Sequence, residues 1–262
     1  MNRIIYLIVA AISSISVTPA FAAISSSANL SNLTYTLTDL DLNDTVTPSL
    51  TWVTNSSYSD YLVRVNSVTD RNIINQAQPY FFDRNNLGYG LYSGSLSTSL
   101  STSSYYTDGS DFFSSSYLAN GSAEGNSGYT SNVSREMSYI LSAKTMVSFS
   151  AVANIQLETT VGYNGFDYEG GRALSYITGD QLDISTNYLP ETYLGQSFSE
   201  VKNLNYTFSN LSQINEETAT IFVGTYVFGY SIAPVPEPET YAMLLAGLSL
   251  VGIAARRRKI SY

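Results

Sequence analysis

Four neighbouring side chains in the first fifth of the chain carry oxygen atoms that could bind a metal ion. Asp39, Asp41 and Asn43 occupy alternate positions, and Asp44 follows directly. In an extended strand, alternate side chains lie on the same side, and oxygen atoms are the ligands that Ca²⁺ prefers. The spacing therefore predicts a calcium site. The alternative is a solvated strand end followed by a turn, because Asp and Asn are common in turns.

Four tyrosines are candidates for contact with carbohydrate. They are Tyr89, Tyr92, Tyr105 and Tyr106. An aromatic ring can cover the apolar face of a sugar while the phenol hydroxyl makes a hydrogen bond. If these side chains are exposed, they form a platform on which sugars stack. The alternative is that they belong to a hydrophobic core, as most aromatic side chains of a β-sandwich do.

The residue types that dominate enzyme catalysis are scarce. The chain contains no histidine and no cysteine, which excludes a Ser-His-Asp triad, a cysteine nucleophile and zinc sites built from these residues. A glycoside hydrolase would depend on two facing carboxylates, for which Asp167 and Glu169 are candidates. Residues 23–233 contain nineteen acidic side chains, enough to supply such pairs by chance. We therefore expect no enzymatic activity.

The charge of the body of the chain limits its partners. Residues 23–233 carry nineteen acidic but only seven basic side chains, whereas the whole chain has a net charge of −9. Nucleic-acid binding depends on cationic patches, so we expect no nucleic-acid partner. An acidic body is typical of a soluble protein outside the cell.

The hydrophobic periodicity predicts strands as the elements that position these residues. Apolar and polar residues alternate at 33–37 and 147–157, as in strands with one buried face. At 219–232 a period of two places aromatic residues on one face and Ile221, Val223 and Val227 on the other. We therefore predict that residues 23–233 form an all-β domain, an antiparallel β-sandwich with a jelly-roll-like topology. A β-solenoid is the alternative, but no internal repeat of fixed length supports it.

Residues 93–134 differ in composition from the rest of the body. Ser, Gly, Tyr and Asn dominate this stretch. We interpret it as a long, partly ordered insertion between the N-terminal and C-terminal strands. The alternative is that its tyrosines are strand residues that cover a sheet.

Residues 1–22 have the organisation of a secretory signal peptide. Arg3 provides the positive start, residues 4–15 are apolar, and Ala20 and Ala22 are the small side chains that a signal peptidase requires. The apolar stretch is short for a membrane span, which needs about 20 residues. We therefore predict export with cleavage after Ala22. An uncleaved N-terminal membrane anchor is the alternative.

Residues 234–262 form a tail with three parts. The first is the motif Pro236, Glu237 and Pro238, whose prolines keep the chain extended. The second is the apolar segment 241–255, predicted to be a single transmembrane helix. The third is a basic cluster that holds its end in the cytoplasm, made of Arg256, Arg257, Arg258 and Lys259. An ordinary tail anchor after a proline-rich linker is the alternative.

This tail resembles the PEP-CTERM sorting signal of Gram-negative bacteria. The resemblance covers residues 235–261 and rests on the order of motif, apolar segment and basic cluster. It implies that an exosortase-type enzyme cleaves the chain near Pro236-Glu237-Pro238 after the tail has engaged the membrane. The destination that it implies is the cell envelope, the outer surface or an extracellular matrix with exopolysaccharide. Unrelated bodies carry such tails, so the resemblance implies nothing about the function of residues 23–233.

These observations predict an exported cell-surface or matrix protein with a structural or adhesive role and without catalysis. Two alternatives stay open. The first is a carbohydrate-binding module of the exopolysaccharide matrix, assisted by calcium through the Asp39–Asp44 segment. The second is a secreted polysaccharide hydrolase. Apart from calcium, no cofactor is expected.

Overall fold

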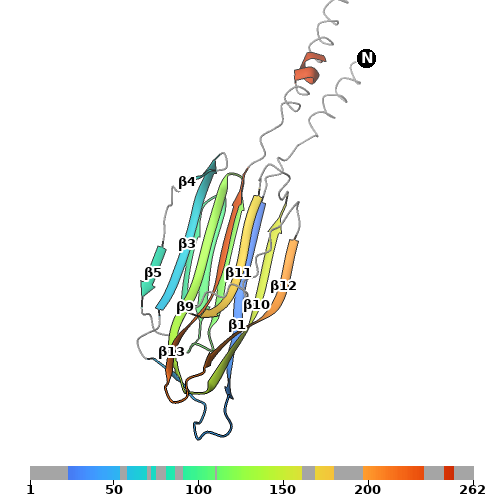
Figure 1. Cartoon of the computed structure of the whole chain (residues 1–262). Coiled ribbons are helices and arrows are strands. Elements are labelled where there is room, and N and C mark those ends of the chain that lie inside the picture. The colour runs from blue at the N-terminus through green and yellow to red at the C-terminus, as the bar shows by residue number, and fades with distance from the viewer. Residues whose placement is uncertain are drawn as a thin grey trace, which may run out of the picture.

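The fold consists of two antiparallel sheets (Figure 1). This computed structural model describes residues 23–53, 58–69, 72–74, 81–85, 91–109, 111–160, 169–179, 197–232 and 245–250. Thirteen strands lie within these ranges, and residues 245–250 are helical. The prediction of an all-β protein with antiparallel sheets is confirmed.

The six-stranded sheet has β1 near its centre, in the order β12-β10-β1-β8-β7-β6. Its strands are β1 (Ala23–Asp39), β6 (Tyr92–Ser97), β7 (Ser101–Asp108), β8 (Ser116–Glu124), β10 (Thr145–Thr159) and β12 (Ser197–Asn210). Antiparallel pairing places residues directly opposite each other, so side chains on one face form rows that cross the strands.

The seven-stranded sheet has the order β11-β13-β9-β3-β4, with β2 also paired to β9 and β5 to β3. Its strands are β2 (Leu50–Trp52), β3 (Tyr58–Thr69), β4 (Asn72–Ile74), β5 (Phe81–Asn85), β9 (Ser127–Leu141), β11 (Glu169–Gly179) and β13 (Glu217–Ser231). A jelly roll has eight strands in total. The thirteen described strands outnumber those of a jelly roll, and the jelly-roll-like topology stays a prediction.

From β8 onwards, consecutive strands alternate between the two sheets. β8, β10 and β12 belong to the six-stranded sheet, and β9, β11 and β13 belong to the other. The sheets lie face to face, since β8 contacts β9 and β13 while β1 contacts β11 and β13. Strands that follow each other in this part of the sequence thus lie in opposite layers of a two-layer sandwich.

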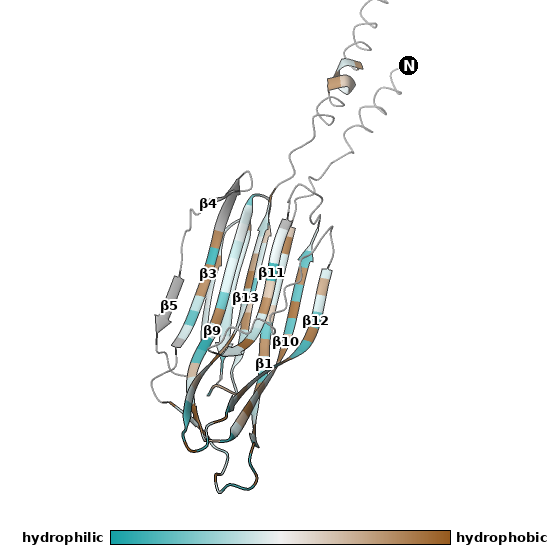
Figure 2. Ribbon diagram, viewed as in Figure 1, coloured by the Kyte–Doolittle hydropathy of each residue, from teal (hydrophilic) through white to brown (hydrophobic). Residues whose placement is uncertain are grey.

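The core lies between the two inner faces and takes alternate side chains of the long described strands. In β10, for example, the odd-numbered residues from Val147 to Leu157 are buried, while the even-numbered residues between them are half-buried or exposed. Figure 2 shows this alternation along β3 and β10 as successive brown and teal bands. Full burial of one such side chain contributes about 1.5–3 kcal/mol, so the alternation determines which face of each strand turns inward.

A bulge in β1 keeps the apolar side of this strand on the core. The pairing register with β10 shifts between Ser31 and Thr34, where Asn32 has a φ of 55°. Asn tolerates this left-handed conformation better than most residues. Inward-facing residues are even-numbered as far as Leu30 and odd-numbered from Leu33 onwards. Without the bulge, the second half of β1 would turn its apolar side chains outward.

Tyrosine rings in the core lie over glycines. The ring of Tyr129 fills the space between Gly121 in β8 and Gly229 in β13, and a Cβ atom at either glycine would overlap it. Tyr105 covers Gly94 in the same manner. The absence of a glycine side chain therefore makes room for a large ring between closely spaced sheets.

Serine hydroxyls connect the two sheets. Ser103 donates to the Thr130 carbonyl at 2.6 Å, and Ser131 donates to the Ser104 carbonyl at 2.6 Å. These bonds need a close approach of β7 and β9, which small side chains allow.

Residues 93–134 form most of β6, all of β7 and β8, and the first half of β9. The expectation that this stretch is a partly ordered insertion is wrong, and its alternative as sheet-covering strands is the better description.

The start of β1 and the end of β13 lie at the same end of the sandwich (Figure 1). Ala23 pairs with Glu124 at the end of β8, and Ser231 pairs with Ser127 at the start of β9. Only two residues separate Glu124 from Ser127 in the chain. The segments that precede and follow the sandwich therefore leave it from one end, called the root below.

Candidate functional site

The outward side of the six-stranded sheet is a large surface of hydroxyl and amide groups, called the polar face below. One row on it crosses all six strands and contains no charged and no apolar side chain. This middle row consists of Ser199, Gln156, Ser27, Asn120, Ser104 and Ser95. The next row towards the root continues the pattern with Ser197, Glu158, Ser25, Ser122, Thr102 and Ser97.

Charged side chains occur on the described part of the polar face only near strand ends. Asp108 ends β7, Glu124 ends β8, and Glu158 is the penultimate residue of β10. Elsewhere the outward positions are mainly Ser, Thr, Asn and Gln, and the apolar or aromatic exceptions are Leu118, Met146, Val152, Val201 and Tyr106. The middle row is thus uncharged, and the charged side chains at the borders of the face are all acidic.

Some hydroxyls of the polar face bind each other across neighbouring strands. The Oγ atoms of Thr102 and Ser122 are 2.7 Å apart, and those of Thr34 and Ser150 are 2.9 Å apart. Such cross-strand pairs contribute to sheet stability. A hydroxyl has one donor and two acceptor positions, so each pair retains hydrogen-bonding capacity towards a ligand.

A shallow depression lies on this face between the two adjacent rows. Its volume is about 280 Å³, and its lining residues include Ser25, Ser27, Thr102, Asn120 and Gln156. These side chains come from four adjacent strands, namely β1, β7, β8 and β10. Ligand-binding pockets usually occupy about 300–1,000 Å³, so the depression is at the lower limit and suits one unit of a longer molecule.

Tyr106 adds one aromatic ring to the polar face. Its side chain is 37% exposed, and its hydroxyl donates to Asp108 Oδ2 at 3.0 Å. The Ser116 hydroxyl and backbone N–H donate to the other carboxylate oxygen of Asp108. The Ser116 hydroxyl lowers the pKa of Asp108, and the hydrogen bond to Asp108 raises the pKa of Tyr106. The ring is therefore held neutral in a fixed position beside the middle row.

The other predicted tyrosines do not join Tyr106. Tyr105 is 5% exposed and stacks on buried Tyr61 with ring centroids 5.0 Å apart. Tyr92 is half-buried and also packs on the Tyr61 ring, with a centroid distance of 5.7 Å. Tyr89 lies outside the described residues. The predicted platform of four tyrosines is wrong for Tyr92 and Tyr105, because successive residues of a strand face opposite sides.

The segment predicted to bind calcium is a turn at the end of β1. The strand ends at Asp39, so the acidic side chains do not share one side of a strand as expected. Three carboxylates each accept a bond from the backbone N–H two residues later, namely Asp39 from Asp41, Asp41 from Asn43, and Asp44 from Val46. Within the described ranges, no three Asp, Glu, His or Cys residues gather as metal ligands. Calcium binding here stays a prediction.

Two carboxylates that the sequence analysis did not pair lie at the root. Glu124 and Glu158 border a second depression of about 350 Å³, next to the first. The main-chain nitrogen of Ala23 also lies there and donates to Thr160 Oγ1 at 2.9 Å. Of the carboxylates proposed for a hydrolase, Asp167 and the side chain of Glu169 lie outside the described residues.

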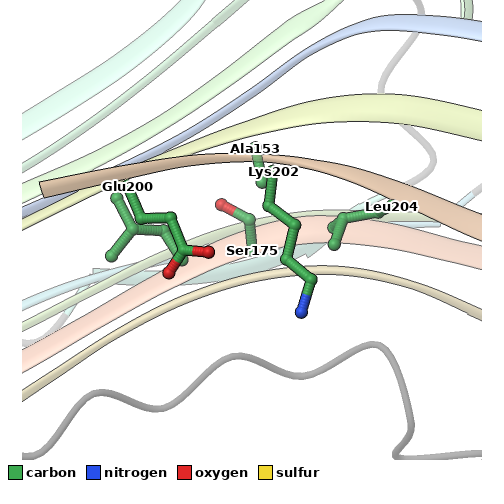
Figure 3. A pocket seen from close by; sticks show the side chains of 6 residues that line it. Ala153, Ser175, Glu200, Lys202 and Leu204 are labelled. Carbon is green, nitrogen blue, oxygen red and sulfur yellow. The ribbon is translucent and has the colours of Figure 1, made fainter.

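The open edge of the sandwich between β11 and β12 has charged side chains on its inner side. Glu200 and Lys202 pair with buried Ile155 and Ala153 of β10 and therefore face inward. Figure 3 shows both side chains extending from the same strand beside Ser175 of β11. The gap that they line is too narrow for a water-sized ligand. We therefore assign it no binding role.

The processing residues lie outside the described ranges. These are the signal residues Ala20 and Ala22, the motif residues Pro236, Glu237 and Pro238, and the basic residues Arg256, Arg257, Arg258 and Lys259. Of the predicted transmembrane segment, residues 245–250 are helical and exposed. In the ranges that the structure covers, no helix reaches the length and apolarity that a bilayer crossing requires.

The polar face was not predicted, although the alternation of polar and buried residues is visible in the sequence. Ser25, Ser27 and Asn29 alternate with buried residues of β1, and Asn154 and Gln156 do so in β10. The alternation identifies outward polar positions, but only the register of all six strands shows that these positions join into rows.

Comparison with known proteins identifies one part of the chain. Residues 234–259 match the family described as the PEP-CTERM protein-sorting motif. No curated protein and no solved structure matches the chain. The matched range includes Pro236-Glu237-Pro238 and the basic cluster, as the resemblance implied. This protein therefore contains a PEP-CTERM sorting domain at its C-terminus and is a PEP-CTERM sorting domain-containing protein.

Proposed function

We propose that this protein is exported, processed by an exosortase-type enzyme and retained at the outer surface or in the extracellular matrix of a Gram-negative cell. There the sandwich has a structural or adhesive role without catalysis. The observation that carries this proposal is the match of residues 234–259 to the sorting motif. That motif implies an exported, envelope-associated protein and an exosortase-type enzyme as partner.

The ends of the sandwich support processing on both sides. Ala23 already belongs to β1 and is bonded to Thr160, and β13 ends at Ser231. Cleavage after Ala22 and near Pro236 would therefore leave every described strand intact. Both cleavage sites would lie close to the root, so the rest of the sandwich stays free to contact other molecules.

The test compares three forms of the protein by cell fractionation and mass spectrometry. We expect the full chain to be retained in the envelope or matrix as material that starts at Ala23 and lacks the basic cluster. A chain without residues 234–262 should be released, and the triple variant Pro236→Ala, Glu237→Ala, Pro238→Ala should accumulate in the membrane with its tail.

The double variant Thr36→Ala, Thr207→Ala is the control, because both residues are exposed and lie near the end of the sheet opposite the root. It should be sorted as the unaltered protein is. Identical distribution of the tailless and full-length chains, or mature material that still contains Arg256–Arg258, would disprove the proposal.

A further inference from the structure

We propose that the polar face binds a neutral polysaccharide, with the sugar chain lying across the strands along the middle row and Tyr106 stacking on one sugar. This inference rests on the proposed adhesive function and names the ligand class and the site. It replaces the predicted four-tyrosine platform by one ring and a row of hydroxyl and amide groups.

The chemistry of the middle row matches that of a neutral sugar. Gln156 and Asn120 each offer two donors and one acceptor atom, and the four serines each offer a hydroxyl. Sugar hydroxyls need the same mixture of donors and acceptors. The row contains no charged group that would attract a charged ligand. The acidic body of the protein also repels anionic polysaccharides.

The geometry of the rows matches an extended chain. Neighbouring strands lie about 4.8 Å apart, so the row presents one polar side chain at this interval over six strands. This interval is close to the length of one sugar unit in an extended polysaccharide. Successive sugars can therefore meet equivalent side chains on successive strands, and the depression at Ser27, Asn120 and Gln156 accommodates one of them.

Tyr106 supplies the stacking surface beside the row. It pairs with Leu118 on β8 and with Ser93 on β6, one step along the strands from Ser104. Its bond to Asp108 fixes the ring before any ligand binds, which lowers the entropic cost of binding. A sugar over this ring would remain within reach of the side chains of the middle row.

A protein partner fits this face less well. Protein interfaces have an apolar centre rich in aromatic side chains, whereas the centre of this face is the middle row of hydroxyl and amide groups. Its exposed apolar side chains, such as Val201 at the edge strand, do not form a continuous patch. The test must therefore distinguish a bound polysaccharide from a second copy of this chain on the same face.

The test measures binding of the purified full-length chain to dextran, galactomannan and mixed-linkage β-glucan, with alginate as the anionic comparison. Calorimetry and affinity electrophoresis supply the readout. We expect binding to at least one of the neutral polysaccharides and none to alginate. Tyr106→Ala and Asn120→Ala should each weaken binding about tenfold, and Tyr106→Phe should restore most of it because the ring is retained.

The matched control is again Thr36→Ala, Thr207→Ala, since these residues lie on the same face in a distant row. It should bind as the unaltered protein does. Absence of binding to all three neutral polysaccharides would overturn the proposal, as would unchanged binding by folded Tyr106→Ala and Asn120→Ala variants. Light scattering would reveal a second copy as the occupant if the same variants changed only the oligomeric state. Sorting of the Tyr106→Ala variant should be normal, so failure of this proposal is distinguishable from failure of the sorting proposal.

Discussion

At the residue scale, the most constrained side chain is Tyr129. Its ring is fully buried between Gly121 and Gly229, and its hydroxyl is 2.6 Å from Ser26 Oγ on β1. One residue thus contacts both sheets and fixes the distance between them. Any atom added at either glycine must displace the ring or the backbone.

Gly121→Ala should therefore destabilise the fold by about 1–3 kcal/mol, the usual cost of overpacking a core. Chemical denaturation of the purified protein measures this change. Ser122→Thr is the control, because Ser122 is the adjacent residue, faces outward and keeps a hydroxyl in this variant; its effect should stay within about 0.5 kcal/mol. Equal stability of Gly121→Ala and the unaltered protein would show that the Tyr129 ring can move aside.

Alkaline pH should destabilise the protein through its buried tyrosines. Burial raises the pKa of both Tyr129 and Tyr176, whereas a tyrosine in the unfolded chain loses its proton near pH 10. Below about pH 10 this contribution to stability is complete, and it is lost as the pH rises towards the folded-state pKa values. Each tyrosine then lowers stability by about 1.4 kcal/mol per pH unit.

Denaturation curves recorded between about pH 9 and about pH 12 would measure this slope. Tyr129→Phe should make the slope shallower by the contribution of one proton, although it also removes the bond to Ser26. An unchanged slope in this variant would show that the buried phenol does not control alkaline unfolding.

At the element scale, β12 is an edge strand that must avoid pairing with other molecules. It is the last strand of its sheet, and its inner side carries Glu200 and Lys202 in place of apolar residues. Inward-facing charges on an edge strand discourage the addition of another strand, because pairing would bury them. The two charges therefore explain how the long edge strand β12 avoids pairing with a strand of another molecule.

The double variant Glu200→Val, Lys202→Val should associate into dimers or larger aggregates. Size-exclusion chromatography with light scattering at increasing concentration would detect this. Asn203→Val is the matched control, since Asn203 faces outward on the same strand and should leave the protein in its original state. A monodisperse double variant at every concentration would show that other features protect the edge.

The elements themselves were largely predictable, because alternation of polar and apolar residues depends only on local spacing. It identified β10 and β13 as strands and the side of β10 on which Phe149 is buried. The stretch 93–134 was misjudged because its order depends on partners distant in sequence. Ser131 bonds to Ser104, and Tyr105 covers Gly94. Composition alone does not show such pairs.

At the scale of the whole molecule, the described strands of the sandwich end before the sorting tail begins. The described strands end at Ser231, and the sorting motif begins at residue 234. We expect removal of residues 234–262 to leave the midpoint of thermal unfolding unchanged within about 2 °C, because no described strand is shortened. A large decrease would mean that the tail stabilises the sandwich.

The two kinds of candidate site differ in how far the sequence could predict them. The sorting tail is a linear motif, so its residues are recognisable without a structure. The polar face depends on the register of six strands, which brings Ser27, Asn120 and Gln156 together from distant parts of the chain. The prediction of an exposed ring is correct for Tyr106 and wrong for its neighbour Tyr105.

The start of β1 and the end of β13 both lie at the root, and this determines which surfaces a tethered molecule offers to its surroundings. A strand of 15 residues, such as β13, is about 50 Å long, and the turn after Asp39 lies at the opposite end, since Asp39 pairs with Thr145 at the start of β10. Antibodies against that distant tip would reach the protein while it is still attached to a cell. Antibodies against the region around Ala23 and Ser231 would reach it only after release. Staining with the two reagents would thus report detachment of the protein without any label on it.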